Sequence, residues 1–309
     1  MIDIFLVALP KDINFLGKDY KGSPITEKLK EVTVSWYKGN DKSKFGQWMY
    51  KQLNGLQDFA KVSYDASMNN SKKGIDIDGL CPNYHRVMSM GHDPILAFIV
   101  GVIDIMQGTV TAIDKNGVVQ VVQVYAGKDS AFYLFEALLK VFCHLLSDIC
   151  TSTGLPVPFM ALLECITGKT PFILDKSGEK VSCTELVRVL YKNGYDMRHM
   201  LTMGIEPFFI EFCIRTYYNL YYFDSLIDLD KDFRHKIKKT SMLTLTHSIA
   251  MSGDVLKMWI NGWNPAAFNY TEFLTLVITV IRALKQQSKY SKIVDDEMCR
   301  RWENIIFKS

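Results

Sequence analysis

The chain has 309 residues, of which 48% are hydrophobic and 22% are charged, and its formal net charge at pH 7 is +3. This length suits one large domain or two smaller ones with a substantial core. A net charge so close to zero argues against binding of nucleic acid through bulk electrostatics.

The first 75 residues form the most polar and least periodic part of the sequence. A short helix is expected to end at Glu31, followed by a charged turn over 38–44. Residues 69–74 have the composition of a flexible linker. We therefore expect a polar N-terminal region, 1–75, that packs on or extends from a helical core domain over 76–309.

The segment 90–106 has the clearest pattern of a buried helix. Asp93 is a residue type that caps helix N-termini, and Pro94 suits the first helical position. The following residues are apolar on almost every face, which predicts burial in a core or in lipid. Asp104 lies about three turns further along. A carboxylate there is costly unless it is paired, protonated or bound to a cation.

The window 94–113 has the ~20 residues that a membrane span requires. It contains Asp104 and Gln107, however, and a central Asp costs about 2.5–3.5 kcal/mol on insertion. We expect no spanning helix. The first ten residues lack a basic region and carry an early acid, so they do not predict a signal peptide.

The rest of the chain alternates hairpin and helix patterns. Two runs rich in Val and Thr, 109–113 and 118–125, flank Asn116-Gly117 and predict a β-hairpin. A second hairpin is expected around Ser177-Gly178. Helical spacing of apolar residues predicts helices over 131–150, 159–166, 183–193, 197–203, 207–227, 240–259, 270–287 and 295–307. The expected fold is mainly α, a multi-helix apolar core with one or two small β-hairpins.

Two short segments resemble each other. Gly91-His92-Asp93-Pro94 and Gly204-Ile205-Glu206-Pro207 each follow a Met and each precede an apolar run. One interpretation is an internal duplication with degenerate halves over 83–170 and 195–285. The alternative is that both segments are independent examples of a common helix start.

A cluster of His and Asp residues carries the strongest chemical signal. His144 and Asp148 lie four positions apart and share a helix face, while His92 and Asp93 begin a neighbouring helix. Imidazole and carboxylate are ligands for Zn²⁺, Mn²⁺ or Fe²⁺, and an open position would let the ion activate water. The alternative is structural, with Asp93 as a cap and the others as local polar pairs.

Two further residues are candidates for catalytic roles. Asp104 and His247 could orient the metal ligands or carry protons. His247 together with Asp254 could also add a metal ligand from the second half of the chain. The alternative for His247 is a hydrogen-bonded histidine of the core.

An aromatic stretch over 208–223 is followed by a basic one. The basic residues are Lys231, Arg234, Lys236, Lys238 and Lys239. Such a combination is typical of a helix at an anionic membrane surface, and it could also stack nucleobases. A core helix followed by a solvated loop is the remaining alternative. We expect an anionic membrane surface or a protein partner rather than nucleic acid.

Two functions follow from these patterns. The first is a helical interaction or membrane-surface protein whose buried His/Asp cluster is structural. The second is a metal-dependent hydrolase that uses the cluster to activate water. The first is favoured because each residue has a credible structural role. The seven cysteines form no CxxC pair and suggest a reduced, cytoplasmic protein, peripheral to the inner face of a membrane if it binds one.

Overall fold

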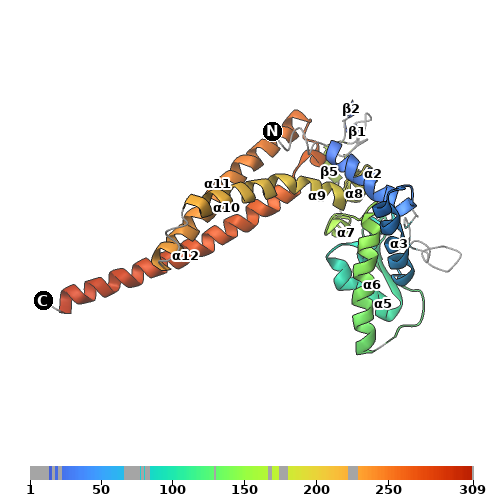
Figure 1. Cartoon of the computed structure of the whole chain (residues 1–309), viewed down its shortest axis with the longest axis horizontal. Helices are drawn as coiled ribbons and strands as arrows, with labels where there is room; N and C mark the ends of the chain where they lie inside the picture. Colours follow the sequence, from blue (N-terminus) through green and yellow to red (C-terminus); the bar gives the residue numbers. More distant parts are fainter. Residues whose placement is uncertain are drawn as a thin grey trace. The chain divides into compact units, whose positions relative to one another are not determined.

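The computed structural model consists mainly of helices, as predicted (Figure 1). Its chain divides into two compact units, Met1–Thr202 (unit 1) and Met203–Ser309 (unit 2). The predicted linker over 69–74 lies outside the described part, and a boundary near residue 75 stays a prediction. The structure describes residues 14–15, 18–19, 23–65, 77, 80, 84–128, 130–165, 169–173, 180–221 and 229–307.

Unit 1 begins with two packed helices. A two-residue strand pair, β1 (Asn14–Phe15) and β2 (Lys18–Asp19), precedes α2 (Pro24–Lys38) and α3 (Lys44–Phe59). Ser23 and Ser43 cap the two helices by accepting backbone N–H groups, and Gly39 ends α2 in the left-handed conformation. The helix predicted to end at Glu31 is therefore longer, and the turn over 38–44 separates it from α3.

The segment after Asp93 differs from the single helix that the sequence predicts. One oxygen of Asp93 accepts the backbone N–H groups of Ile95 and Leu96, both at 3.0 Å, but it caps a turn and not the predicted α-helix. The short helix α4 (His85–Met88) is followed by two 3₁₀ turns, η2 (Met90–His92) and η3 (Leu96–Phe98). The α-helix that comes next, α5, covers only Val100–Gln107.

The predicted helix is interrupted at two backbone positions. Ile95 and Ile99 have φ near −107° and −111°, well away from the helical value. Gly91 and Gly101 approach Tyr64 so closely that a side chain on Gly91 would overlap the tyrosine ring. The expected burial on almost every face is also wrong, because four apolar side chains of this segment are exposed, namely Ile95, Phe98, Ile99 and Ile103.

The predicted Asn-Gly hairpin is confirmed. Strands β3 (Thr109–Ile113) and β4 (Val119–Gln123) pair antiparallel, with Thr109 opposite Gln123 and Ile113 opposite Val119. Gly117 has a φ of +79°, a conformation that favours glycine. Asp114 accepts backbone N–H groups of the turn and fixes it.

Gly117→Ala should destabilise the protein by at least about 1 kcal/mol. Alanine is strained at this φ, and its Cβ would lie 2.8 Å from the backbone oxygen of Glu164. Urea unfolding measures the change. Gly55→Ala in α3 is the matched control, because nothing lies within 4 Å of its Cβ and alanine favours helices. Equal stability of both variants would contradict this description of the turn.

The core of unit 1 lies where α5, β3 and α6 (Ala131–Ile149) meet. Figure 1 places α6 beside α3 and α5, and α6 contacts both. Beyond α6 come α7 (Met160–Leu163), the pair β5 (Lys169–Ile173) and β6 (Lys180–Ser182), then α8 (Cys183–Lys192) and α9 (Met197–Met203). The pair β5–β6 corresponds to the second predicted hairpin, whose turn lies outside the described residues.

Unit 2 is built from three long helices. These are α10 (Ile205–Tyr221), α11 (Leu229–Ile260) and α12 (Tyr270–Phe307), with the short η5 (Pro265–Ala267) before α12. The charged run over 230–239 belongs to α11 and is not a loop, and the two predicted terminal helices are one. Lys and Arg favour helices, and no Gly or Pro interrupts either stretch.

The described helices contain no stretch with both the length and the low charge that a bilayer crossing demands. The two resembling segments also begin differently, because Ile205 starts a long α-helix whereas Pro94 does not. An internal duplication stays a prediction.

Candidate metal centre

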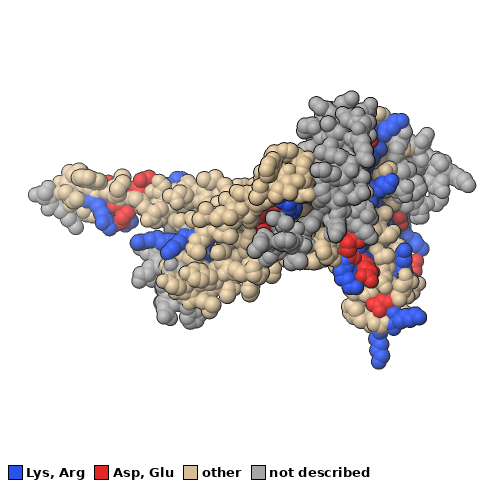
Figure 2. Space-filling view, turned by 90° about the horizontal axis from the view of Figure 1, so that it is seen from above, with Lys and Arg blue, Asp and Glu red and all other residues tan. Residues whose placement is uncertain are grey.

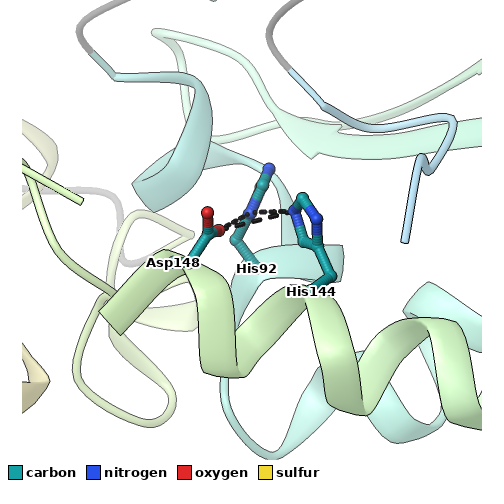
Figure 3. Close-up of side chains that lie close together, drawn as sticks. All are labelled: His92, His144 and Asp148. Atoms are coloured by element: carbon teal, nitrogen blue, oxygen red, sulfur yellow. Dashed lines mark hydrogen bonds and ion pairs between the residues drawn. The ribbon is translucent and has the colours of Figure 1, made fainter. Parts of the chain in front are cut away.

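Three of the predicted ligands converge in unit 1 (Figure 3). Asp148 Oδ2 lies 2.9 Å from His92 Nδ1 and 3.4 Å from His144 Nε2, and the two imidazole nitrogens are 3.3 Å apart. His92 comes from η2, while the other two come from consecutive turns of α6. All three side chains are buried. The prediction that His144 and Asp148 lie on the same face of one helix is therefore confirmed.

The three residues are held by groups that the sequence did not reveal. His92 Nε2 lies 3.1 Å from the backbone oxygen of Tyr64, and the Tyr64 ring packs edge-on against both imidazoles. Arg86 Nη2 lies 3.0 Å from Asp148 Oδ1, leaving Oδ2 to face the histidines. Arg86 was visible in the sequence only as a basic residue before the Gly-His-Asp-Pro segment.

Arg86 also connects the site to the loop that follows α6. Its Nη1 donates hydrogen bonds to the hydroxyls of Thr151 and Thr153. The buried Arg198 donates to the backbone oxygens of Thr151 and Ser152, and Asp196 neutralises it at 2.6 Å. This loop is therefore fixed by two guanidinium groups, which in turn hold the end of α6.

The protonation of His92 is constrained by its neighbours. A backbone carbonyl can only accept, so Nε2 of His92 carries a proton and donates it to Tyr64. In the neutral ring, Nδ1 would then direct a lone pair at the carboxylate oxygen of Asp148, only 2.9 Å away. Two acceptors stay at this distance only if a cation lies between them. That cation is either a proton on Nδ1 or a metal ion.

The charges around the site keep Asp148 ionised. Burial alone would raise the pKa of Asp148, but His144, Arg86 and His92 together hold that pKa well below its ordinary value. Burial lowers the pKa of His144, which favours its neutral form despite the nearby carboxylate. An ionised carboxylate beside a neutral imidazole is the state in which both groups can bind a metal.

The three facing atoms have the spacing of metal ligands. Zinc at about 2.05 Å from tetrahedral ligands holds them about 3.3 Å apart, and the three edges here are 2.9, 3.3 and 3.4 Å. A metal-bound histidine usually donates its second N–H to a carbonyl or carboxylate. His92 does so to Tyr64, so the residues present fit a divalent ion.

The other two acids near this sequence segment have different partners. Asp93, also predicted as a ligand, caps the turn at Ile95 and does not belong to the converging group. Asp104 accepts hydrogen bonds from the hydroxyls of Thr109 and Thr111 at 2.7 and 2.8 Å and from a backbone N–H. Burial raises the pKa of Asp104, while these donors oppose the shift. Its carboxylate joins α5 to β3.

His247 lies in unit 2 and forms a separate buried pair. Its Nδ1 is 2.7 Å from Glu272 Oε1, and its Nε2 is 3.8 Å from Glu211 Oε1, so three helices contribute to the contact. Asp254, which the sequence groups with His247 as a possible ligand, lies 4.0 Å from Lys257. The pairing with Glu272, 25 residues away, was not predicted.

The predicted basic group lies at the start of α11. Arg234, Lys236 and Lys238 are exposed, and Lys239 lies over the ring of Tyr218 at 5.8 Å from its centre. The side chain of Lys231 lies outside the described part of the chain.

A groove of about 620 Å³ lies on the surface of unit 1. Its lining includes Lys61, Asp65, Lys128 and Lys140. Asp65 also acts electrostatically on His144 and Arg86, and it follows Tyr64 in the chain. None of the three cluster residues lines this groove, and Asp65 is joined to the cluster through the neighbouring Tyr64, whose ring packs against both imidazoles.

Glu164 is a second buried acid of unit 1, and it should make stability depend on pH. Burial raises its pKa to about 7, while Arg188 opposes the shift. The unfolded chain loses this proton at lower pH, so wild-type stability should fall as the pH rises from about 4.5 to 7. Glu164→Gln should remove this loss, on the order of 2–3 kcal/mol above pH 7.

Urea unfolding at pH 5 and pH 8 measures that difference. Glu31→Gln is the control, because Glu31 is exposed and its ion pair with Lys28 is on the surface. The control should keep the wild-type dependence on pH. If the free energy of unfolding of Glu164→Gln depends on pH as that of the wild type does, burial does not raise the pKa of Glu164 in the folded protein.

The described residues thus include one buried His/Asp group that could bind a metal ion or serve a structural role. Its three members come from two segments more than 50 residues apart in the chain. The sequence and the structure were also compared with known proteins. The chain matches no protein-family model, no curated protein and no solved structure.

Proposed function

We propose that unit 1 binds one divalent metal ion through His92 Nδ1, His144 Nε2 and Asp148 Oδ2. The observation that carries this proposal is the triangle of 2.9, 3.3 and 3.4 Å formed by these three atoms. Arg86 binds the other carboxylate oxygen, so it leaves Oδ2 available. Tyr64 holds His92 in the required tautomer through its backbone oxygen.

The reaction class that suits this site is hydrolysis. A divalent ion with three protein ligands keeps a position for water and lowers the pKa of that water to near 7. We propose that a substrate approaches from the groove lined by Asp65 and three lysines, because Asp65 follows Tyr64, whose ring packs against both imidazoles. Within this proposal Arg86 and Tyr64 are positioning residues, because they act through Asp148 and His92.

Calorimetric titration of the chelator-treated protein with ZnCl₂ and MnCl₂ tests the binding step. One ion per chain is expected. Hydrolysis of bis(p-nitrophenyl) phosphate and p-nitrophenyl acetate, with and without the ion, then tests the reaction. Absence of binding would leave the structural alternative, with a proton between His92 and Asp148. Binding without hydrolysis of either probe would reject the proposed hydrolysis but not the metal site.

A second function is supported by unit 2. We infer that α10 and the start of α11 bind an anionic membrane surface peripherally. Phe208, Phe212 and Tyr221 of α10 are exposed by 58–71%, and Arg234, Lys236 and Lys238 are exposed on the adjoining helix. Exposed aromatic and basic side chains of this kind favour a lipid–water boundary. In Figure 2, most of the unit 2 surface on view is uncharged, with Lys and Arg gathered in a few places.

Co-sedimentation with vesicles tests this second function. The protein should bind vesicles containing phosphatidylserine and should be released at high salt. Replacing Arg234, Lys236 and Lys238 with Glu should reduce binding at least tenfold, because each basic residue contributes about 1 kcal/mol at such a surface. A triple variant that binds as the wild type does would exclude this surface. Replacing Lys28, Lys42 and Lys51 of unit 1 with Glu is the matched control.

A further inference from the structure

Helix α6 has an outer face that is apolar along its whole length. Its inner face holds His144 and Asp148, while the opposite face exposes five apolar side chains by 40–81%. These are Phe132, Phe135, Leu139, Phe142 and Leu146. Hereafter they are called the α6 stripe. Among the described elements, those that contact α6 leave these side chains exposed.

The spacing of the stripe is that of a coiled coil. Its successive members are three, four, three and four residues apart, which is the alternation of positions a and d in a heptad. In a helix that packs only against the core of its own chain, the 3-4 spacing of apolar residues would lie on the buried face. Here the buried face carries a separate set of residues that includes Ala137 and Val141. The outer pattern therefore indicates a second helix as its partner.

The amount of apolar surface is that of a stable interface. The elements η3 and α5, which contact α6, add four exposed side chains, namely Ile95, Phe98, Ile99 and Ile103. With about 200 Å² for each fully exposed large side chain, the five side chains of the stripe expose on the order of 550 Å², and these four side chains expose on the order of 400 Å² more. The largest apolar patch on a typical monomer is about 300–600 Å². A standard interface buries about 800 Å² on each partner.

We propose that the α6 stripe is the interface of a homodimer, in which α6 of one copy packs antiparallel on α6 of a second copy. The stripe contains no charged or hydrogen-bonding side chain, so shape alone must specify its partner. In an antiparallel pair centred on Leu139, Phe132 faces Leu146 and Phe135 faces Phe142, while Leu139 meets its own copy. This arrangement places the Phe at one end of the stripe against the Leu at the other end, whereas a parallel pair would place Phe on Phe or Leu on Leu in every layer. Such an isologous contact is closed, as twofold dimers require.

This dimer is independent of metal binding, although both use α6. Glu136 and Lys140, which flank the stripe, are 2.8 Å apart and neutralise each other within one chain. No basic or Tyr/Trp side chain belongs to the stripe, although these are the residues that anchor helices at membrane surfaces. A second copy of the chain is for these reasons the occupant that we assign to it.

Sedimentation equilibrium of the full chain tests the interface. The wild type should be a dimer at micromolar concentration, and Phe135→Glu should raise its dissociation constant at least 100-fold. Trp302→Glu is the matched control, since Trp302 on α12 of unit 2 is 63% exposed against 62% for Phe135, and it should leave the dimer unchanged. Both variants should retain the wild-type circular dichroism spectrum. A monomeric wild type, or a Phe135→Glu dimer as tight as the wild type, would overturn the proposal.

A disulfide test distinguishes the antiparallel pair from other arrangements. Leu139→Cys, in a chain whose exposed Cys213 and Cys299 are changed to Ser, should form a covalent dimer on mild oxidation, because residue 139 lies at the twofold axis. Phe132→Cys in the same chain should not. Cross-linking of both variants would mean a parallel pair and would contradict the antiparallel arrangement. If neither variant cross-links and the monomer binds neutral vesicles, the stripe is a lipid surface and the proposal is wrong.

Discussion

Replacing His144 with Ala should reduce the affinity for Zn²⁺ by on the order of 100-fold or more. The substitution removes one of three ligands, and even residues that only support ligands contribute 10–100-fold. Asp148 Oδ2 and His92 Nδ1 would remain, 2.9 Å apart, and could share a proton instead. Metal content after dialysis against a trace of zinc measures the effect. The wild type should retain one ion per chain and the variant almost none.

His235→Ala is the control for that experiment. His235 lies in unit 2, where its Nδ1 is 3.0 Å from the hydroxyl of Tyr218, and it is not part of the cluster. The control should bind as much zinc as the wild type. If His144→Ala also keeps its ion, the metal is bound elsewhere on the chain and the assignment of the three ligands is wrong.

Asp148→Asn should destabilise the protein by about 3–5 kcal/mol, a large part of the 5–15 kcal/mol that stabilises a typical domain. The substitution keeps the shape of the side chain but leaves the buried Arg86 without its counter-charge. Chemical unfolding at pH 7 measures the loss. Asp58→Asn is the matched control, because Asp58 pairs with Lys61 on the surface, where such a pair contributes at most about 1 kcal/mol.

The effect of Asp148→Asn should depend on pH. Because the pKa of Asp148 is lower in the folded protein, its contribution is complete above the unfolded pKa of about 3.9. It is lost as the pH falls below that value toward the folded pKa. The difference between wild type and variant should therefore be constant from pH 5 to 7 and should shrink below pH 4. A difference that grows on acidification would contradict this account.

Local patterns in the sequence predicted much of the fold. The Asn116-Gly117 hairpin and the shared face of His144 and Asp148 were both correct, because each depends on neighbours within a few residues. The helix predicted from Pro94 was wrong. The backbone departs from the helical φ at Ile95 and Ile99, and nothing in the local periodicity of this apolar run marks those two positions.

The composition of the site was only partly predictable. His92 was correctly grouped with His144 and Asp148, but Arg86 and the Tyr64 carbonyl were missed, because nothing local distinguishes a buried arginine from a surface one. Asp93 was also predicted as a ligand, but it does not belong to the converging group. A side chain that starts a turn already has donors in the next two backbone N–H groups, and such local hydrogen bonds compete with ligation.

The central claim is that a metal ion lies among His92, His144 and Asp148. Anomalous diffraction at the zinc absorption edge, from crystals of the full chain grown with ZnCl₂, tests it most directly. We expect one strong peak about 2.0–2.2 Å from His92 Nδ1, His144 Nε2 and Asp148 Oδ2. No peak at this position, with His92 Nδ1 still in hydrogen-bonding contact with Asp148, would contradict the claim and leave a proton in the place of the metal.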